Sequence, residues 1–159
     1  MKTDASRKKL AEMATEIFEL TMLSTLARAR ARSADNRDEP QVTETEFLAL
    51  DSLVKQGPMT VGEIQKIIGV LPAQMSRVIR ALEGKSGGAF VECSINPDDR
   101  RRVDVSITKA GLTAHEDYRN ARLTMTMEVL SGLRPEDRDQ FIRILRTIRA
   151  HIDKRLQSK

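Results

Sequence analysis

Apolar side chains recur at helical spacing over most of the chain. Residues 6–32 contain neither Gly nor Pro, and their apolar positions predict one long amphipathic helix. The polar stretch 33–40 does not continue this helix, because Asn and Asp compete for local backbone hydrogen bonds and Pro40 has no N–H to donate. We therefore expect a surface connection there. The apolar positions of the helix are Leu10, Met13, Ile17 and Leu20.

Two shorter helices are expected to follow, each opened by a capping box. Thr43 with Glu46 opens the first, which ends before Gly57, and Thr60 with Glu63 opens the second. Gly69 then closes the second helix at a position where a positive φ is usual. The apolar stripes are Phe47, Leu50, Leu53 and Val54 in the first helix, and Ile64, Ile67 and Ile68 in the second.

A third helix begins at Pro72, since Pro suits the first helical position. The tight connection 69–71 before it gives a helix-turn-helix, in which the second helix presents its outer face to a DNA groove. The spacing places Met75, Val78, Ile79 and Leu82 on the buried side and Ala73, Gln74, Ser76, Arg77 and Arg80 on the outer face. Small and donor-rich side chains suit contacts to bases and phosphates, although an ordinary amphipathic surface helix has the same pattern.

A β-hairpin is expected between Gly84 and Thr108, because apolar and polar residues alternate through Val103, Val105 and Ile107. Its loop is marked by the polar segment 96–99. Three consecutive arginines leave the loop at the start of the return strand: Arg100, Arg101 and Arg102. A charge run is usually only a solvated surface, but a basic hairpin tip directly after a helix-turn-helix is a wing.

The C-terminal third predicts two further helices, one capped by Thr108 and one opened by Pro135. Their apolar stripes exceed what a small winged domain can cover. We therefore expect a mainly α fold with a small β-hairpin wing (α+β), formed as a single domain over residues 1–159. In it, a winged helix-turn-helix lobe over 42–109 is joined to a helical dimerisation layer from 6–32 and 110–156.

Composition narrows the choice of partner. The chain has 159 residues, of which 40% are hydrophobic and 3% aromatic, with a formal net charge of +4. Tyr118 is the single tyrosine and Trp is absent, so the stacking surface of single-strand binders is missing and duplex DNA is the expected nucleic-acid partner. No apolar stretch approaches the length of a membrane span, and no hydrophobic signal core follows Met1. We expect a cytoplasmic protein that makes no membrane contact.

The residues that carry chemistry are too few for an enzyme or a metal centre. Cys93 is the only cysteine, and the two histidines, His115 and His151, are expected to be exposed structural residues of helices. We therefore expect no catalytic site, no cofactor and no metal site. Glu92 lies beside Cys93 and no Lys or Arg follows until Arg100, which favours a structural strand residue over a redox sensor.

From Val42 to Gly111 the chain resembles the winged helix-turn-helix of the MarR family of bacterial transcriptional regulators. The matching segments are TETEFLALDSL, GPMTVGEI, MSRVIRALEG and PDDRRRVDVSITKAG, of which the last is the most specific. Two features depart from the family pattern. Leu71 stands where a small hydroxyl N-cap is usual, and the segment GKSGGAFVEC is longer than the typical connection and lacks a basic residue where Cys93 stands.

The resemblance implies site roles and a mode of assembly. It places Gln74, Ser76 and Arg77 in the major groove and Arg101 in the minor groove, with Arg100 and Arg102 flanking it and Asp99 holding the loop. It also implies a homodimer on pseudo-palindromic operators, and a small-molecule effector of unknown identity. We thus expect a transcriptional regulator, as a repressor that the effector releases. A winged-helix protein–protein adaptor and a cysteine-based redox regulator are the alternatives.

Overall fold

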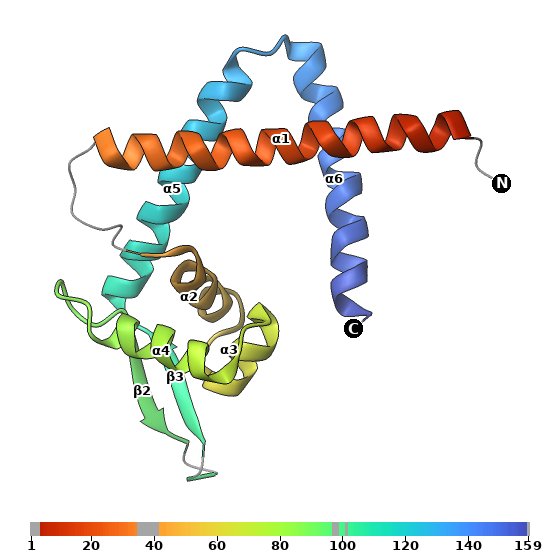
Figure 1. Ribbon diagram of the computed structural model, residues 1–159. Helices are drawn as coiled ribbons and strands as arrows, with labels where there is room; N and C mark the ends of the chain where they lie inside the picture. Colours follow the sequence, from red (N-terminus) through yellow and green to blue (C-terminus); the bar gives the residue numbers. More distant parts are fainter. Residues whose placement is uncertain (1–3, 35–41, 97–98, 101, 159) are drawn as a thin grey trace. The chain divides into compact units, whose positions relative to one another are not determined.

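The computed structural model describes residues 4–34, 42–96, 99, 100 and 102–158. They divide into two compact units, Met1–Gln41 and Val42–Lys159 (Figure 1). The described residues of the first unit form helix α1 (Asp4–Ala34), which confirms the helix expected over 6–32. Most of the connection expected at 33–40 lies outside the described residues. The large apolar side chains exposed on α1 are Leu10, Met13, Ile17, Phe18, Leu20, Met22, Leu23 and Leu26.

The second unit contains five helices and a small sheet among its described residues (Figure 1). In chain order these are α2 (Glu44–Gln56), β1 (Met59–Thr60), α3 (Val61–Ile68), α4 (Pro72–Glu83), β2 (Val91–Ile95), β3 (Val103–Ile107), α5 (Lys109–Ser131) and α6 (Pro135–Gln157). The sheet is antiparallel with strand order β1-β3-β2. The expected mainly α fold with a β-hairpin is confirmed, but strand β1 was not expected.

Both capping boxes are present and fix where α2 and α3 begin. The Glu46 carboxylate accepts the Thr43 N–H at 2.7 Å, and the Thr43 hydroxyl accepts the Glu46 N–H at 3.3 Å. Thr60 and Glu63 make the same reciprocal pair at 2.8 and 3.3 Å. Gly69 ends α3 with a φ of 76°, as the sequence predicts. These local signals set where α2 and α3 begin and where α3 ends.

The core lies where α2, α3, α4 and the sheet meet. Its most completely buried large side chains are Leu50, Leu53, Ile64, Met75, Leu82, Val91 and Val105. In α2 and α3, two residues assigned to apolar stripes are in fact exposed, Val54 by 42% and Ile67 by 50%. Each residue turns the helix by about 100°, so a side chain at the edge of a stripe can miss the core.

Helix α5 begins inside this unit. Thr108 caps it, because its hydroxyl accepts the Gly111 N–H at 3.0 Å while donating to the Ala89 carbonyl at 2.6 Å. Gly111 and Ala114 are buried against the lobe. Helix α6 starts at Pro135 as expected, and none of its residues is buried. Among the described helices, none combines the length and apolar character needed to cross a bilayer.

Candidate nucleic-acid interface

Helix α4 has one buried and one solvent-facing side. Met75, Ile79 and Leu82 are buried in the core and Val78 is half-buried, as the periodicity predicts. On the other side Ala73, Gln74, Arg77 and Arg80 are exposed and Ser76 is half-buried. The Ser76 hydroxyl donates to the Pro72 carbonyl at 3.1 Å, which leaves its oxygen lone pairs available as acceptors. The expected outer-face residues therefore form one solvent-facing surface.

The start of α4 has no side-chain cap, because the N-cap residue is Leu71. Its carbonyl accepts the N–H groups of Gln74 and Met75, both at 3.0 Å, so the first turn closes through backbone bonds alone. The Gln65 side chain donates to the Val70 carbonyl at 2.8 Å and closes the turn between α3 and α4. This turn fixes how the outer face of α4 is presented.

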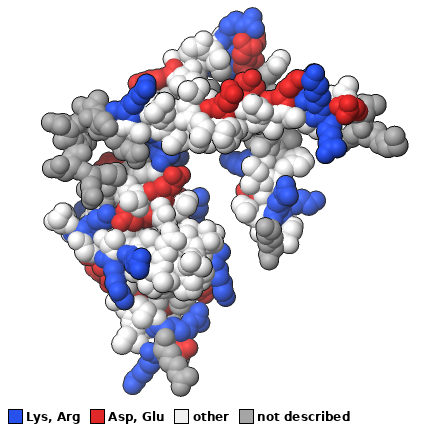
Figure 2. Space-filling model, viewed as in Figure 1, with Lys and Arg blue, Asp and Glu red and all other residues white. Residues whose placement is uncertain are grey.

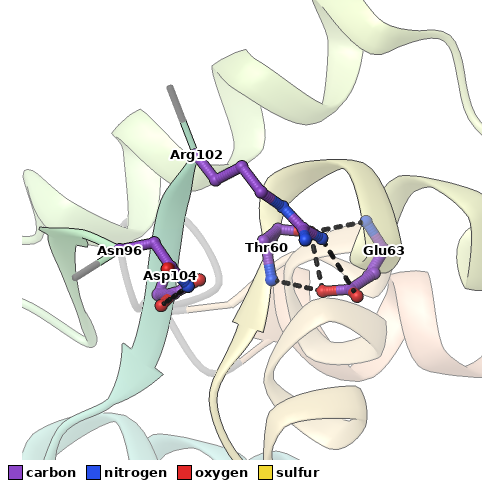
Figure 3. A network of polar contacts seen from close by, with 5 residues as sticks. All are labelled: Thr60, Glu63, Asn96, Arg102 and Asp104. Carbon is purple, nitrogen blue, oxygen red and sulfur yellow. Dashed lines mark hydrogen bonds and ion pairs between the residues drawn. The ribbon is translucent and has the colours of Figure 1, made fainter. Parts of the chain in front are cut away.

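The β2–β3 hairpin is the expected wing, and hydrogen bonds join its described residues near the loop; Figure 3 shows the bond between Asn96 and Asp104. The Asn96 side chain donates to the Asp104 carboxylate at 2.7 Å and accepts the Asp99 N–H at 3.0 Å. The Asp99 carbonyl accepts the Arg102 N–H at 2.9 Å, so Asp99 contributes to the loop through its backbone. Residues 97, 98 and Arg101 lie outside the described residues.

Basic side chains gather at the wing end of the second unit (Figure 2). Arg100 and Arg102 are both exposed. Arg102 is not an isolated cation, because its guanidinium lies 3.4 Å from a carboxylate oxygen of Glu63. Hydrogen bonds from the Thr60 hydroxyl and N–H lower the pKa of Glu63, with a smaller contribution from the Arg102 charge. Sequence reasoning identified Glu63 as a capping residue and missed this pair across 39 positions.

A partly buried ion pair secures the segment that connects α4 to the wing. Lys85 Nζ lies 2.9 Å from Glu46 Oε1, with the Lys85 side chain 22% exposed and that of Glu46 5% exposed. Glu46 is also the capping residue of α2. The long connection that departs from the family pattern is thus anchored to α2.

A cluster of aromatic and charged side chains joins α2 to α5. The Phe47 ring stacks on the rings of His115 and Tyr118, with centroids 4.9 and 4.4 Å apart. His115 is 6% exposed, so its expected exposure was wrong: its Nε2 lies 3.1 Å from the Asp51 carboxylate. Burial raises the pKa of Asp51, but hydrogen bonds from Lys55 and His115 together bring it below its usual value. The histidine is a packing residue between two helices.

Cys93 lies exposed on β2, opposite Val105 in β3. Desolvation of the thiol, together with the hydrogen bond that it donates to the Glu83 carboxylate and the negative charge of Glu83, raises its pKa to about 11. A reactive thiol needs a depressed pKa. The surroundings of Cys93 favour the structural role over the redox role.

We expect the Cys93 thiol to react slowly near neutral pH. Because little of it is ionised at pH 8, its alkylation by iodoacetamide should be roughly 100-fold slower than that of free cysteine and should rise with pH past 10. Mass spectrometry of the intact protein measures this rate, with the unfolded protein as control. A rate near that of free cysteine at pH 8, or operator binding that responds to peroxide in the parent but not in Cys93→Ser, would favour the redox role.

Comparison with known proteins identifies the lobe. The model of the MarR family matches residues 42–103. An HTH-type transcriptional regulator of Mycobacterium leprae is 32% identical over 117 residues, which cover 74% of this chain and 79% of the relative. The HTH-type transcriptional regulator YwaE of Bacillus subtilis is 30% identical over 149 residues, covering 88% and 85%. The chain belongs to the MarR family.

Solved structures show the same MarR fold. A MarR family protein from Bacillus stearothermophilus superposes with a TM-score of 0.74 at 19% identity, covering 92% of this chain and 97% of that one. The YusO protein of Bacillus subtilis gives a TM-score of 0.67 at 24% identity, covering 88% and 97%. The fold that the chain shares with these structures therefore extends beyond residues 42–103 that the family model matches.

Proposed function

We propose that this MarR-family protein is a repressor that binds duplex DNA through the outer face of α4 and the wing, acting in the cytoplasm. The observation that carries the proposal is the division of α4 into an apolar buried side and an exposed side with Gln74, Arg77 and Arg80. When a helix packed in this way enters the major groove, its exposed hydrogen-bond donors reach the base edges. The HTH-type transcriptional repressor MdtR of Bacillus subtilis is 25% identical over 129 residues, which supports the repressor role.

In this proposal the two parts of the interface have different tasks. Gln74 and Arg77 read base edges, since Gln pairs well with adenine and Arg with guanine. The exposed wing arginine Arg100, and Arg101 as expected from the sequence, supply charge to phosphates or to a narrow minor groove. The net charge of +4 agrees with a polyanionic partner.

We further propose that the protein is a homodimer. Among the described residues, eight large apolar side chains are exposed on α1 and seven on α6, and large exposed apolar surfaces mark interaction sites. A second copy of this chain that covers these side chains accounts for their exposure. A two-fold axis then places two α4 helices on half-sites about 34–36 Å apart, so the operator is a pseudo-palindrome.

The proposal includes a small molecule that regulates DNA binding. BpsR of Bordetella bronchiseptica, whose DNA binding is regulated by 6-hydroxynicotinic acid, superposes with a TM-score of 0.56 at 23% identity over 84% of this chain and 98% of BpsR. We propose that an effector of unknown identity releases this protein from its operator.

A thermal-shift screen of aromatic acids, with 6-hydroxynicotinic acid as the first probe, tests the effector proposal. An effector raises the melting temperature in a concentration-dependent way.

Selection of binding sites from a random duplex pool tests the DNA-binding proposal. We expect an enriched inverted repeat whose half-site centres lie about 10 base pairs apart or a multiple of that spacing. The Arg77→Ala protein should enrich a less specific sequence from the same pool. A pool that stays unenriched, with no duplex retained, would contradict DNA reading and favour a protein–protein adaptor.

The dimer proposal predicts a solution mass twice the 17.9 kDa of the chain. Placing charges on the exposed stripe of α6 by Ile148→Glu together with Ile152→Glu should prevent association and leave apolar stripes open to solvent. We expect aggregated or unfolded protein in light scattering. The control is Arg146→Glu with Arg149→Glu on the same helix, which adds the same number of acidic residues and lowers the net charge by four rather than two, yet should leave the dimer soluble. A soluble, folded monomer from the isoleucine variant would place the dimer interface elsewhere.

A further inference from the structure

Arg102 differs from the other described wing arginine in what surrounds it. Its backbone takes part in the hairpin at both ends, since its N–H donates to the Asp99 carbonyl and its carbonyl accepts the Asn96 N–H, both at 2.9 Å. From this root of the wing the side chain extends across to the start of α3 (Figure 3). Arg100 lies within the turn itself. Arg102 is therefore placed to hold the wing, and Arg100 lies at its tip.

The acceptor of Arg102 is itself fixed. One oxygen of Glu63 accepts the N–H and the hydroxyl of Thr60, at 2.8 and 2.6 Å, and the other faces the Arg102 guanidinium at 3.4 Å. The capping box therefore stops the carboxylate from turning away. Because the Glu63 carboxylate is fixed, the Arg102 guanidinium can pair with it in one orientation only.

The same residues connect α3 to the loop of the wing. Thr60 belongs to β1 and stands opposite Asp104 in β3. Asp104 accepts the side-chain N–H of Asn96, which in turn accepts the Asp99 N–H in the loop. Two routes, one through the sheet register and one through the Arg102–Glu63 pair, thus join the start of α3 to the wing.

We propose that Arg102 is a positioning residue that orients the wing by pairing with Glu63, and that it does not serve as a phosphate contact. This inference rests on the proposed function for its role in DNA binding. It differs from the DNA-contact role that the sequence predicts for Arg102. Both side chains of the pair are about half exposed, so the pair biases the orientation of the wing and contributes little to overall stability.

Hydrogen exchange in the free protein tests the pair without any DNA. The amides of Asn96 and Arg102 report the hairpin, and the variants are Arg102→Gln, Glu63→Gln, the double variant and the control Arg100→Gln. Gln at 63 keeps the acceptor that the capping box needs. We expect protection of these amides to fall up to about five-fold in each single variant and no further in the double variant. Arg100→Gln should leave it unchanged.

The salt dependence of duplex binding gives the second readout. The slope of log affinity against log salt counts the phosphates that a protein neutralises, and it should fall by about one for Arg100→Gln. We expect Arg102→Gln to weaken binding several-fold with the slope unchanged, and Glu63→Gln to do the same. Unchanged amide protection, or tighter binding by Glu63→Gln with a reduced slope for Arg102→Gln, would overturn the proposal. If the parent protein binds no duplex, the proposed function fails while hydrogen exchange still decides the role of Arg102.

Discussion

Replacing Gly111 by alanine is expected to destabilise the winged lobe by about 3 kcal/mol or more, since a backbone clash of this kind belongs to the upper range of single substitutions. A Cβ at this position would lie 2.1 Å from the Phe90 carbonyl oxygen and 2.9 Å from Ile107 Cγ1. The first of these atoms is backbone and cannot rotate away. Helix α5 cannot retreat without loss either, because Thr108 bonds to both the Gly111 N–H and the Ala89 carbonyl.

Calorimetry and denaturant titration measure this effect, and a lower melting temperature by roughly 10 °C corresponds to it for a chain of this size. Gly62 provides the matched control, because it lies in helix α3 and a Cβ there meets no atom within 4 Å. Gly62→Ala should leave stability unchanged or raise it by up to about 1 kcal/mol. Equal stabilities of the two variants would show that α5 does not approach Phe90 this closely.

Removing the Lys85 ammonium is expected to cost about 3 kcal/mol, the range seen when one partner of a buried ion pair is lost. Glu46 is 5% exposed on its side chain, and Lys85 Nζ is 2.9 Å from its carboxylate. Lys85→Met keeps most of the aliphatic stem and takes away the charge, so the carboxylate remains buried beside Thr43 with no cation. Urea unfolding measures the loss.

Lys55→Met is the matched control for this experiment. Lys55 also pairs with a carboxylate, that of Asp51, but its own side chain is 68% exposed, so about 0.5 kcal/mol is expected. Adding Glu46→Gln to Lys85→Met should restore most of the lost stability, since Gln preserves the capping box without a buried charge. Similar small losses for Lys55→Met and Lys85→Met would mean that the Glu46 carboxylate is well solvated.

The features that the sequence predicts correctly are those encoded within a few neighbouring residues. The Thr43 and Thr60 capping boxes, the αL glycine Gly69 and the buried side of α4 depend on spacings of three or four positions. Strand β1 was missed because two residues carry no alternation. It forms because β3 supplies a partner 46 positions away, with Met59 opposite Val105.

Two contacts that the sequence did not predict are long-range. Arg102 reaches Glu63 across 39 positions, and His115 reaches Asp51 across 64. No periodicity or motif encodes such pairs, since each depends on how three or more elements pack. The outer face of α4 was predictable because one helix alone determines it, whereas the role of a wing arginine depends on the element that it faces.

In the proposed function, the outer face of α4 reads DNA sequence and the wing supplies charge. Competition of the selected operator against a scrambled duplex of the same composition tests it most directly, at one salt concentration. We expect the parent protein to prefer the operator by about 10³-fold or more. Gln74→Ala and Arg77→Ala should each reduce that preference by roughly 1–3 kcal/mol, while Arg100→Ala should weaken both duplexes alike. A preference that survives both α4 substitutions unchanged would contradict the account.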